Sequence, residues 1–279
     1  MFKKTEFINY KTKNTALMHE YEAKARSWLS EFGDNHLAEQ IPFFRDGIVS
    51  PENWFRKNNT FRPLIILKEV SLGINKVEEL PQFLDLWGQP QFFEFAENQF
   101  DDIRIGTFPQ WQRIAKLLKG MEEIHNGAEC CDYYKYDFNF IPGGELYSGD
   151  IAGYKQYNRE RTANQTYNQI IDSCAVIEIK KLGGGQTVGS DLSLATRYYT
   201  EHIDPFLDLL CRQIDLIDPT VVICLGRENG ECISSLLKNV KRKTKDRIWI
   251  DGYHHTRSSN NNFYYTPLAA YKEHLRTKF

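Results

Sequence analysis

Four short apolar runs in the middle and at the end of the chain constrain the fold more than any other feature. Each run is nearly continuous rather than alternating and is rich in β-branched or aromatic side chains; the runs lie at 63–68, 174–180, 220–226 and 247–251. A strand that is apolar at successive positions is buried on both faces, as the central strands of parallel sheets are. The sequence therefore predicts a central, mostly parallel four-stranded sheet.

Helical patterns precede, separate and follow these runs. We expect helices at 15–40, 109–124, 192–216, 229–240 and 267–278. Strands that alternate with helices form layered α/β structures, so the fold class expected is a three-layer α/β sandwich with additional N-terminal helices. We expect a single domain over residues 1–279, with a helical extension at 1–55 and the α/β core at 60–275.

The composition is that of a soluble globular protein: of 279 residues, 41% are hydrophobic and 26% are charged. No apolar stretch approaches the ~18 residues of a membrane-spanning helix, and the first residues do not resemble a signal peptide. The six cysteines include no CxxC pair, which favours reduced thiols over a metal site. We therefore expect a cytoplasmic protein without a metal and without membrane contact.

Polar residues follow each apolar run, and in open parallel sheets ligands bind beyond the carboxyl ends of the strands. The first run leads into 68–71 and the second ends with Glu178-Ile-Lys180 before three glycines. The third runs into Gly226-Arg227 and the fourth into 253–259. Two carboxylates, a histidine pair, hydroxyl groups and glycines are thus expected to converge on one edge of the sheet.

This arrangement resembles the uracil-DNA glycosylase superfamily over residues 60–275. The segment LKEVS corresponds to the Gly-Gln/Glu/Asn-x-Pro motif that family members place after the first strand, with Lys68 in place of glycine and Ser71 in place of proline. The segment YHHTR corresponds to the Tyr-His-Pro-Ser-Arg version of the last motif, with His255 in place of proline. Glu178 stands where the family has a base-reading Asn.

The resemblance implies a uracil-DNA glycosylase-like fold and a DNA N-glycosylase that needs no cofactor and no metal. Its partner would be DNA, with no obligate protein partner evident. The implied catalytic residues are Glu69 and His254. The implied substrate-binding residues are Glu178, Ser71, His255, Thr256, Arg257 and Ser259. The implied DNA-binding residues are Lys68, Lys180, Lys241 and Arg242, the last two in a basic strip at 238–245 that could equally be solvated surface.

The chemistry of base excision accounts for these residue types. Breaking an N-glycosidic bond leaves positive charge on the sugar, as in glycoside hydrolysis, and a carboxylate such as Glu69 can stabilise that charge and hold a water. His254, or alternatively His255, can stabilise the anion that forms on the departing base, an effect worth ~3 kcal/mol by analogy with oxyanion donors. The base must be flipped out and stacked on an aromatic ring, which residues 92–111 or 133–140 could supply.

Glu178 predicts which base is removed. An amide matches the donor and acceptor pattern of uracil, whereas a carboxyl group can accept from the N4 amine of cytosine and, when protonated, donate to N3. Removing ordinary cytosine would damage the host genome, so we expect a modified cytosine, such as glucosylated hydroxymethylcytosine in phage DNA. The long loops expected at 125–170 could accommodate the added sugar.

Other interpretations remain open at this point. Glu178-x-Lys180 matches half of a Mg²⁺-dependent restriction-type nuclease site, with Asp150 or Asp172 as the missing acid. A non-catalytic DNA-binding or nucleotide-binding module is a third possibility. Structural roles are also open: Glu69 as a helix cap or a partner of Lys68, His254 as a structural histidine, and the glycines at 183–185 as a flexible turn. Glu178 could pair with Lys180 or Lys181.

Overall fold

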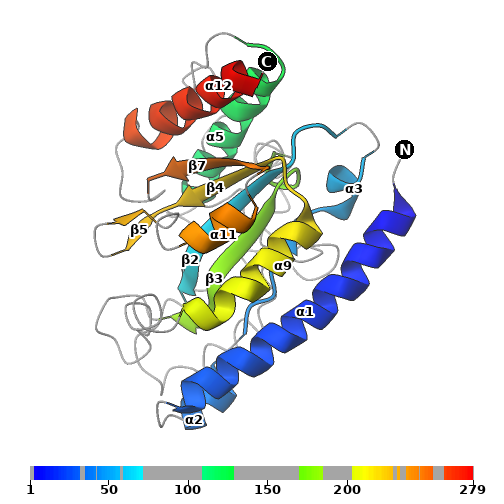
Figure 1. Ribbon diagram of the computed structural model, residues 1–279, viewed down its shortest axis with the longest axis vertical. Coiled ribbons are helices and arrows are strands. Elements are labelled where there is room, and N and C mark those ends of the chain that lie inside the picture. The colour runs from blue at the N-terminus through cyan, green and yellow to red at the C-terminus, as the bar shows by residue number, and fades with distance from the viewer. Residues whose placement is uncertain are drawn as a thin grey trace, which may run out of the picture.

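A computed structural model of the protein shows helices on both faces of a mixed β-sheet (Figure 1). The residues that the structure describes are 3–31, 35–41, 43–56, 59–71, 109–128, 170–184, 203–228, 231–232, 237–244, 246–253 and 261–278. The expected α/β class is confirmed. None of the helices within these ranges is long and apolar enough to cross a membrane.

The sheet contains the four expected parallel strands and one more. Its order is β1-β3-β2-β4-β7. The parallel strands are β2 (Pro63–Ser71), β3 (Ala175–Gly184), β4 (Val221–Leu225) and β7 (Ile248–Gly252). The expected count of four was wrong because β1 (Gly47–Ile48) pairs antiparallel with the outer edge of β3. A strand of two residues is too short to leave an apolar pattern in the sequence.

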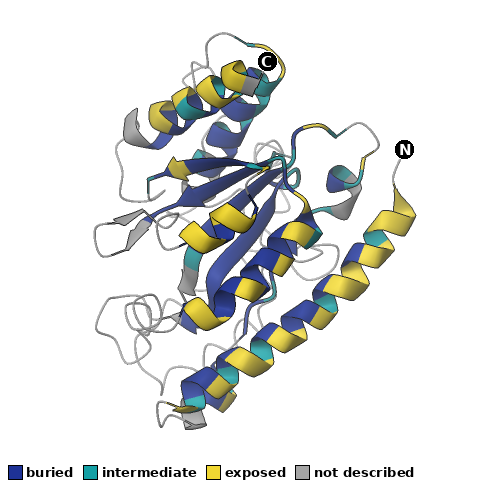
Figure 2. Cartoon of the chain, in the orientation of Figure 1, coloured by how far each residue is buried: buried dark blue, intermediate teal, exposed yellow. Residues whose placement is uncertain are grey.

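Side chains alternate between two apolar layers along each strand. On β2, Leu64 and Ile66 pack into the layer beneath the N-terminal helices, and Ile65 and Leu67 pack into the opposite layer. Both layers are buried, and Figure 2 shows the strands enclosed between helices whose outer faces are exposed. This two-sided burial is the physical origin of the continuous apolar runs.

The helices are distributed between the two faces by the direction of each crossover. The helix in the β2-to-β3 connection, α5 (Pro109–His125), covers one face together with α12 (Thr266–Lys278). The helices that precede β4 and β7, α9 (Leu207–Ile217) and α11 (Lys238–Lys243), cover the other face. Right-handed crossovers that step in opposite directions place their helices on opposite faces, which explains the division.

The remaining elements refine the expected boundaries. The single helix expected at 15–40 is two helices, α1 (Lys4–Glu31) and α2 (Asn35–Gln40), and α3 (Pro51–Trp54) follows. The helices expected at 109–124 and 267–278 are confirmed as α5 and α12, the latter preceded by η7 (Asn261–Tyr265). Of the helix expected at 192–216, residues 192–202 lie outside the described residues, and η6 (Asp204–Phe206) leads into α9.

The helix expected at 229–240 was wrong at its start. Two short strands, β5 (Arg227–Glu228) and β6 (Glu231–Cys232), pair antiparallel at this point, and α11 begins only at Lys238. Antiparallel strands of two residues leave no periodic pattern in the sequence. The apolar spacing of the residues that follow them therefore predicted a helix that begins too early.

A buried ion pair joins the N-terminal segment at 43–49, which includes β1, to β3. Asp46 and Lys181 are both fully buried, and the Lys181 ammonium lies 2.6 Å from each carboxylate oxygen of Asp46. Gln213 of α9 donates to Asp46 Oδ1 at 2.8 Å, and the aromatic ring of Tyr21 of α1 lies 5.0 Å from the ammonium. Four segments distant in sequence therefore meet at one charged pair.

The same pair completes the hydrogen bonding of the outer edge of β3. β1 pairs with Ala175 and Val176, and Phe44 donates its N–H to the carbonyl of Lys181 at 2.8 Å. Between these points the N–H of Glu178 donates to Asp46 Oδ2 at 2.6 Å, and its carbonyl accepts from the Lys181 ammonium at 2.9 Å. Buried backbone groups need partners, and here side chains supply what a longer β1 would have supplied.

We predict that Lys181→Met destabilises the fold by about 3–5 kcal/mol, because it leaves the Asp46 carboxylate buried without its cation. The double variant Asp46→Asn with Lys181→Met should recover part of this loss. Urea unfolding followed by circular dichroism measures both.

The exposed pair Glu20–Arg212, joined at 2.7 Å, provides the matched control. Arg212→Met should cost less than about 1 kcal/mol, since exposed ion pairs contribute little. A Lys181→Met variant as stable as Arg212→Met would contradict the role assigned to the buried pair.

Candidate functional site

Of the residues singled out in the sequence, Glu69, Ser71 and Lys180 lie toward the carboxyl edge of the sheet, and the strands run further than expected. β2 continues to Ser71, so Glu69 and Ser71 belong to the strand rather than to the loop after it. β3 likewise continues to Gly184, which places Glu178 in its first half. In the register of the sheet Glu69 stands beside Lys180, and Ser71 beside Gly184 after a bulge.

The sheet divides at this edge. β2 pairs with β4 only from Pro63 to Ile66, whereas its pairing with β3 continues to Ser71. The chain leaves β2 toward β3 on one side and leaves β4 toward β7 on the other. Strands whose connections diverge in this way form the topological switch point at which α/β proteins bind ligands. Glu69 lies on the part of β2 that borders this division.

Glu178 and Lys180 lie on one face of β3 and are both buried, with 3% and 1% of their surface exposed. Strand alternation places them on the same side as Val176, in the layer beneath α5 and α12. Lys68 on β2 is half-buried. Keeping a carboxylate and an ammonium group in the interior is costly unless they interact with other polar groups or serve a function.

Lys181 points away from this pair of residues. Its carboxylate partner is Asp46, which the sequence gave no reason to single out, and its contact with Glu178 is to the backbone carbonyl. Asp46 and Lys181 are separated by 135 positions in the chain. No local pattern could have linked them, and the only available signal was an acid beside Arg45 in a largely apolar and aromatic segment, IPFFRDGIV.

The parallel strands β4 and β7 end side by side. Leu225 of β4 is in register with Gly252 of β7, and the N–H of Gly226 donates to the carbonyl of Gly252 at 3.2 Å. A side chain at Gly252 would come within 2.4 Å of a Leu225 methyl group, so the close approach of the two strands favours glycine there. The described part of this segment ends at the half-buried Tyr253.

Several expected site residues lie outside the described residues: His254, His255, Thr256, Arg257, Ser259 and Asp150. The same holds for the aromatic candidates at 92–108 and 133–140. For Glu69 and Ser71 the structure describes the backbone alone. Asp172 precedes the amino end of β3, so it lies at the far end of that strand from Lys180.

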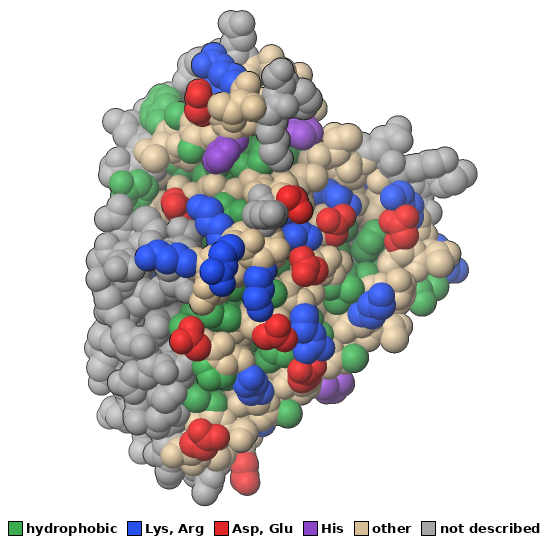
Figure 3. All heavy atoms as spheres, viewed as in Figure 1, with side chains coloured by type: hydrophobic (Ala, Val, Ile, Leu, Met, Phe, Trp, Pro, Cys, Tyr) green, Lys and Arg blue, Asp and Glu red, His purple; other side chains and the backbone are tan. Residues whose placement is uncertain are grey.

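The basic strip forms a surface feature. Lys241 and Arg242 are exposed on α11, whose buried residue Val240 packs against the core. Figure 3 shows Lys and Arg side chains gathered over this helix, with acidic side chains mixed among them over α9 and α1. Lys243 lies 3.8 Å from Asp208 of α9, which partly offsets its charge.

Comparison with models of known protein families, with curated proteins and with solved structures finds no match. Within the part of the chain that the structure describes, no group of three or more His, Cys, Asp or Glu side chains is arranged to hold a metal ion.

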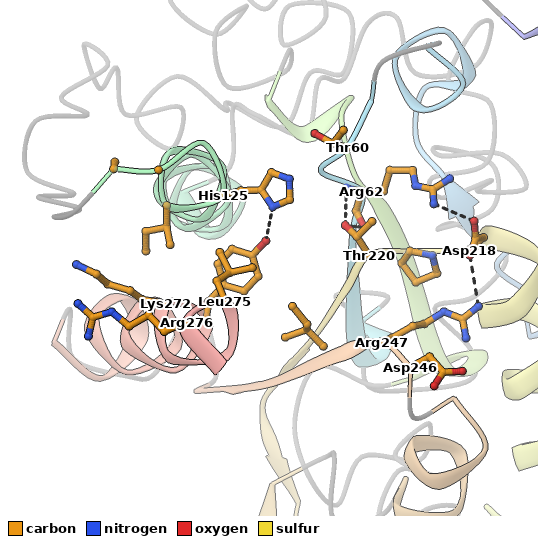
Figure 4. A pocket seen from close by; sticks show the side chains of 16 residues that line it. Thr60, Arg62, His125, Asp218, Thr220, Asp246, Arg247, Lys272, Leu275 and Arg276 are labelled. Carbon is orange, nitrogen blue, oxygen red and sulfur yellow. Dashed lines mark hydrogen bonds and ion pairs between the residues drawn. The ribbon is translucent and has the colours of Figure 1, made fainter. Parts of the chain in front are cut away.

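A cavity of about 900 Å³ lies at the opposite, amino-terminal edge of the sheet (Figure 4). The chain enters β2, β4 and β7 beside it, at Arg62, Thr220 and Arg247, and the C-terminal parts of α5 and α12 close its other side. The sequence contained no motif for this place, because its lining comes from strand starts and helix ends that are far apart in the chain.

His125 lies on the helical side of this cavity. Its Nδ1 is 2.9 Å from the hydroxyl of Tyr271, and the two rings are nearly parallel, at 13°. Burial lowers the pKa of His125 below its ordinary value, and the nearby Glu122 carboxylate opposes this shift to a smaller extent. Burial also raises the pKa of Tyr271, so both groups are neutral at pH 7.

We predict that the protein loses stability as the pH falls below about 6.5, and that part of this loss disappears in His125→Gln. The unfolded chain binds a proton at the ordinary histidine pKa of about 6.5, whereas the folded chain binds it only at lower pH, so acid favours unfolding. Urea midpoints measured between pH 7.5 and pH 5 test this. Parallel pH profiles for the two proteins would show that the half-buried imidazole of His125 does not contribute to the pH dependence of stability.

Proposed function

We propose that this protein is a DNA glycosylase that hydrolyses the N-glycosidic bond of a flipped-out modified pyrimidine and leaves an abasic site. The observation that carries the proposal is the arrangement of the carboxyl edge. Glu69 on β2 stands in register beside Lys180 on β3, Glu178 shares the face of Lys180, and β2 borders the switch point that lies between β2 and β4. The strand that leads to His254 ends at the same edge.

The roles of these residues follow from the charge that develops during the reaction. Glu69 holds the attacking water and stabilises positive charge on the sugar, and His254 stabilises the base as it departs with negative charge. Lys180 stands beside Glu69 in the register and keeps the edge from accumulating only negative charge. Lys68, with Lys241 and Arg242 on α11, contacts the phosphate backbone.

The burial of Glu178 fits a role in reading the base. A protonated carboxyl group presents one hydrogen-bond donor and one acceptor. That pair is complementary to the N3 and N4 edge of cytosine. We therefore propose a modified cytosine as the substrate, of which glucosylated hydroxymethylcytosine in phage DNA is the example that spares the host genome.

A second candidate function rests on the same cluster. Glu178 and Lys180 are two residues apart on one face of β3, and Glu69 is in register with Lys180. Two carboxylates and a lysine at this spacing could hold Mg²⁺ and orient a water in a nuclease. The two reactions differ in what they need and leave: a nuclease needs the metal and cuts the strand directly, whereas a glycosylase leaves an abasic site that alkali later cuts.

We predict that the purified protein, in the presence of EDTA, converts DNA that contains glucosylated hydroxymethylcytosine into DNA that alkali cleaves at that base. Glu69→Gln should reduce the rate by about 10²-fold or more, because a positioned carboxylate contributes on this scale. Denaturing gels with and without alkali measure the reaction on DNAs that bear uracil, cytosine, hydroxymethylcytosine or the glucosylated base.

Glu39→Gln provides the matched control, since Glu39 is exposed and distant in the chain from this edge. It should retain the wild-type rate, and thermal unfolding verifies that both variants are folded. Strand cleavage that requires Mg²⁺ and no alkali would establish the nuclease instead. Absence of any DNA product from all four substrates would contradict both functions.

We further predict that Glu178→Gln shifts the preference from modified cytosine toward uracil. The amide of Gln donates to O4 and accepts from N3–H of uracil, and it matches cytosine only after a half-turn that exchanges its oxygen and nitrogen, so neighbours that hold one orientation favour one base. The ratio of the two excision rates is the measured quantity and should change by about tenfold or more. An unchanged ratio, at a reduced overall rate, would mean that Glu178 supports the site without reading the base.

A further inference from the structure

The cavity at the amino-terminal edge is separate from the carboxyl edge, because the parallel strands run from one to the other. Its volume of about 900 Å³ falls within the range of small-molecule sites. None of the residues assigned to base excision lines it. A ligand held in this cavity is therefore distinct from the nucleotide proposed to bind at the carboxyl edge.

The charges around the cavity balance one another. On the strand side Asp218 lies 2.8 Å from Arg62 and 3.7 Å from Arg247, and Arg247 also lies 3.0 Å from Asp215. Asp246 adds a third carboxylate, and the C-terminal ends of α5 and α12 add about half a negative charge each. Together these groups offset the four basic side chains of the lining.

The two basic side chains of α12 do not reach into the space between the walls. Figure 4 shows Lys272 and Arg276 directed away from His125 and from the strand side, and Lys272 interacts with a partner of its own. A charged ligand of either sign would leave water here without gaining an opposite charge, which is unfavourable. The cavity therefore favours an uncharged ligand.

Apolar side chains line both walls of the cavity. Ile124 of α5 and Leu275 of α12 belong to the helical wall, and Pro219 and Ile248, at the starts of β4 and β7, belong to the strand wall. A sugar fits such walls poorly, because its hydroxyl groups would lose water without gaining hydrogen bonds. A planar ring system fits better, since its faces are apolar and its polar atoms lie on its edge.

Two polar groups face the same space. Figure 4 shows the imidazole of His125 across from Thr60. The imidazole Nδ1 contacts the hydroxyl of Tyr271 at 2.9 Å, whereas Nε2 and the Thr60 hydroxyl have no hydrogen-bond partner within the described part of the chain. Burial lowers the pKa of His125, so at pH 7 the imidazole is neutral and its Nε2 either donates or accepts. A hydroxyl group can do both, so the two groups together match a donor and an acceptor that lie side by side on a ring.

We propose that this cavity binds an uncharged, planar nitrogen heterocycle of about the size of a nucleoside, with its faces against the apolar walls and its polar edge at His125 and Thr60. The site goes beyond base excision, since it lies at the other end of the strands. Adenosine is the informative probe, because its base presents a donor and an acceptor side by side and the carboxyl edge is proposed to read a pyrimidine.

Calorimetric titration with adenosine, adenosine 5′-monophosphate and ribose tests the site. Adenosine should bind wild type, the monophosphate should bind no more tightly because the charges of the cavity are already balanced, and ribose should not bind. Thr60→Val, which keeps the shape of the side chain and removes its hydroxyl, should weaken adenosine binding by about threefold to tenfold. Ala128→Trp, which places a bulky side chain in the lining without changing its charge, should abolish binding.

The matched control is Thr12→Val, because Thr12 is exposed on α1 and does not line the cavity. It should change the affinity for adenosine by less than about twofold, since a substitution away from the site has little effect. Thermal unfolding verifies that all three variants are folded. Equal affinities of Thr60→Val and Thr12→Val, binding that survives Ala128→Trp, or no binding of adenosine to wild type would each overturn the proposal.

The other two probes can overturn it as well. A monophosphate that binds at least about tenfold more tightly than adenosine would identify an anion site, which the balanced charges do not predict. Ribose that binds as tightly as adenosine would show that the ring is not recognised. No DNA is present in these titrations, so this proposal and base excision fail separately.

Discussion

The buried contact between Asp46 and Lys181 is the constraint on which the rest of the structure depends. A charged pair without exposure is costly to bury, and it is retained only when its geometry and additional hydrogen bonds are good. Here the additional partners are the backbone of Glu178 and the amide of Gln213. The pair therefore positions β3 relative to α9 and the N-terminal segment, and it fixes the backbone at the residue proposed to read the base.

The parts of the fold that could be predicted from sequence are those whose causes are local. Strands buried on both faces are apolar at most positions, so β2, β3, β4 and β7 were evident as apolar runs. Helices α5 and α12 were evident from their apolar spacing. β1 and the β5–β6 pair were not, because strands of two residues carry no period, and their pairing depends on chain segments that arrive from elsewhere.

The candidate site was predictable only in outline. Parallel strands bring their carboxyl ends to one edge, and that rule alone placed Glu69 near Lys180. The sequence could not show that β2 and β3 continue past their apolar runs, since the polar stretch 68–71 is held in the strand by pairing with β3. Strand alternation alone sends Lys180 and Lys181 to opposite layers, but the sequence could not show that Lys181 meets Asp46, because that partner lies far away in the N-terminal segment.

The two edges of the sheet differ in chemistry because of where the helices begin and end. Each crossover helix runs antiparallel to its strands, so helix C-termini gather at the amino-terminal edge and attract basic side chains in their last turns. α5 ends there with His125, and α12 carries Lys272 and Arg276. The carboxyl edge instead collects residues directly from the strands, with Lys180 buried toward it and Glu178 buried further back, in the first half of β3. A buried carboxylate and a buried lysine are costly unless they interact with other polar groups, whereas the exposed Arg276 of α12 keeps its contact with water.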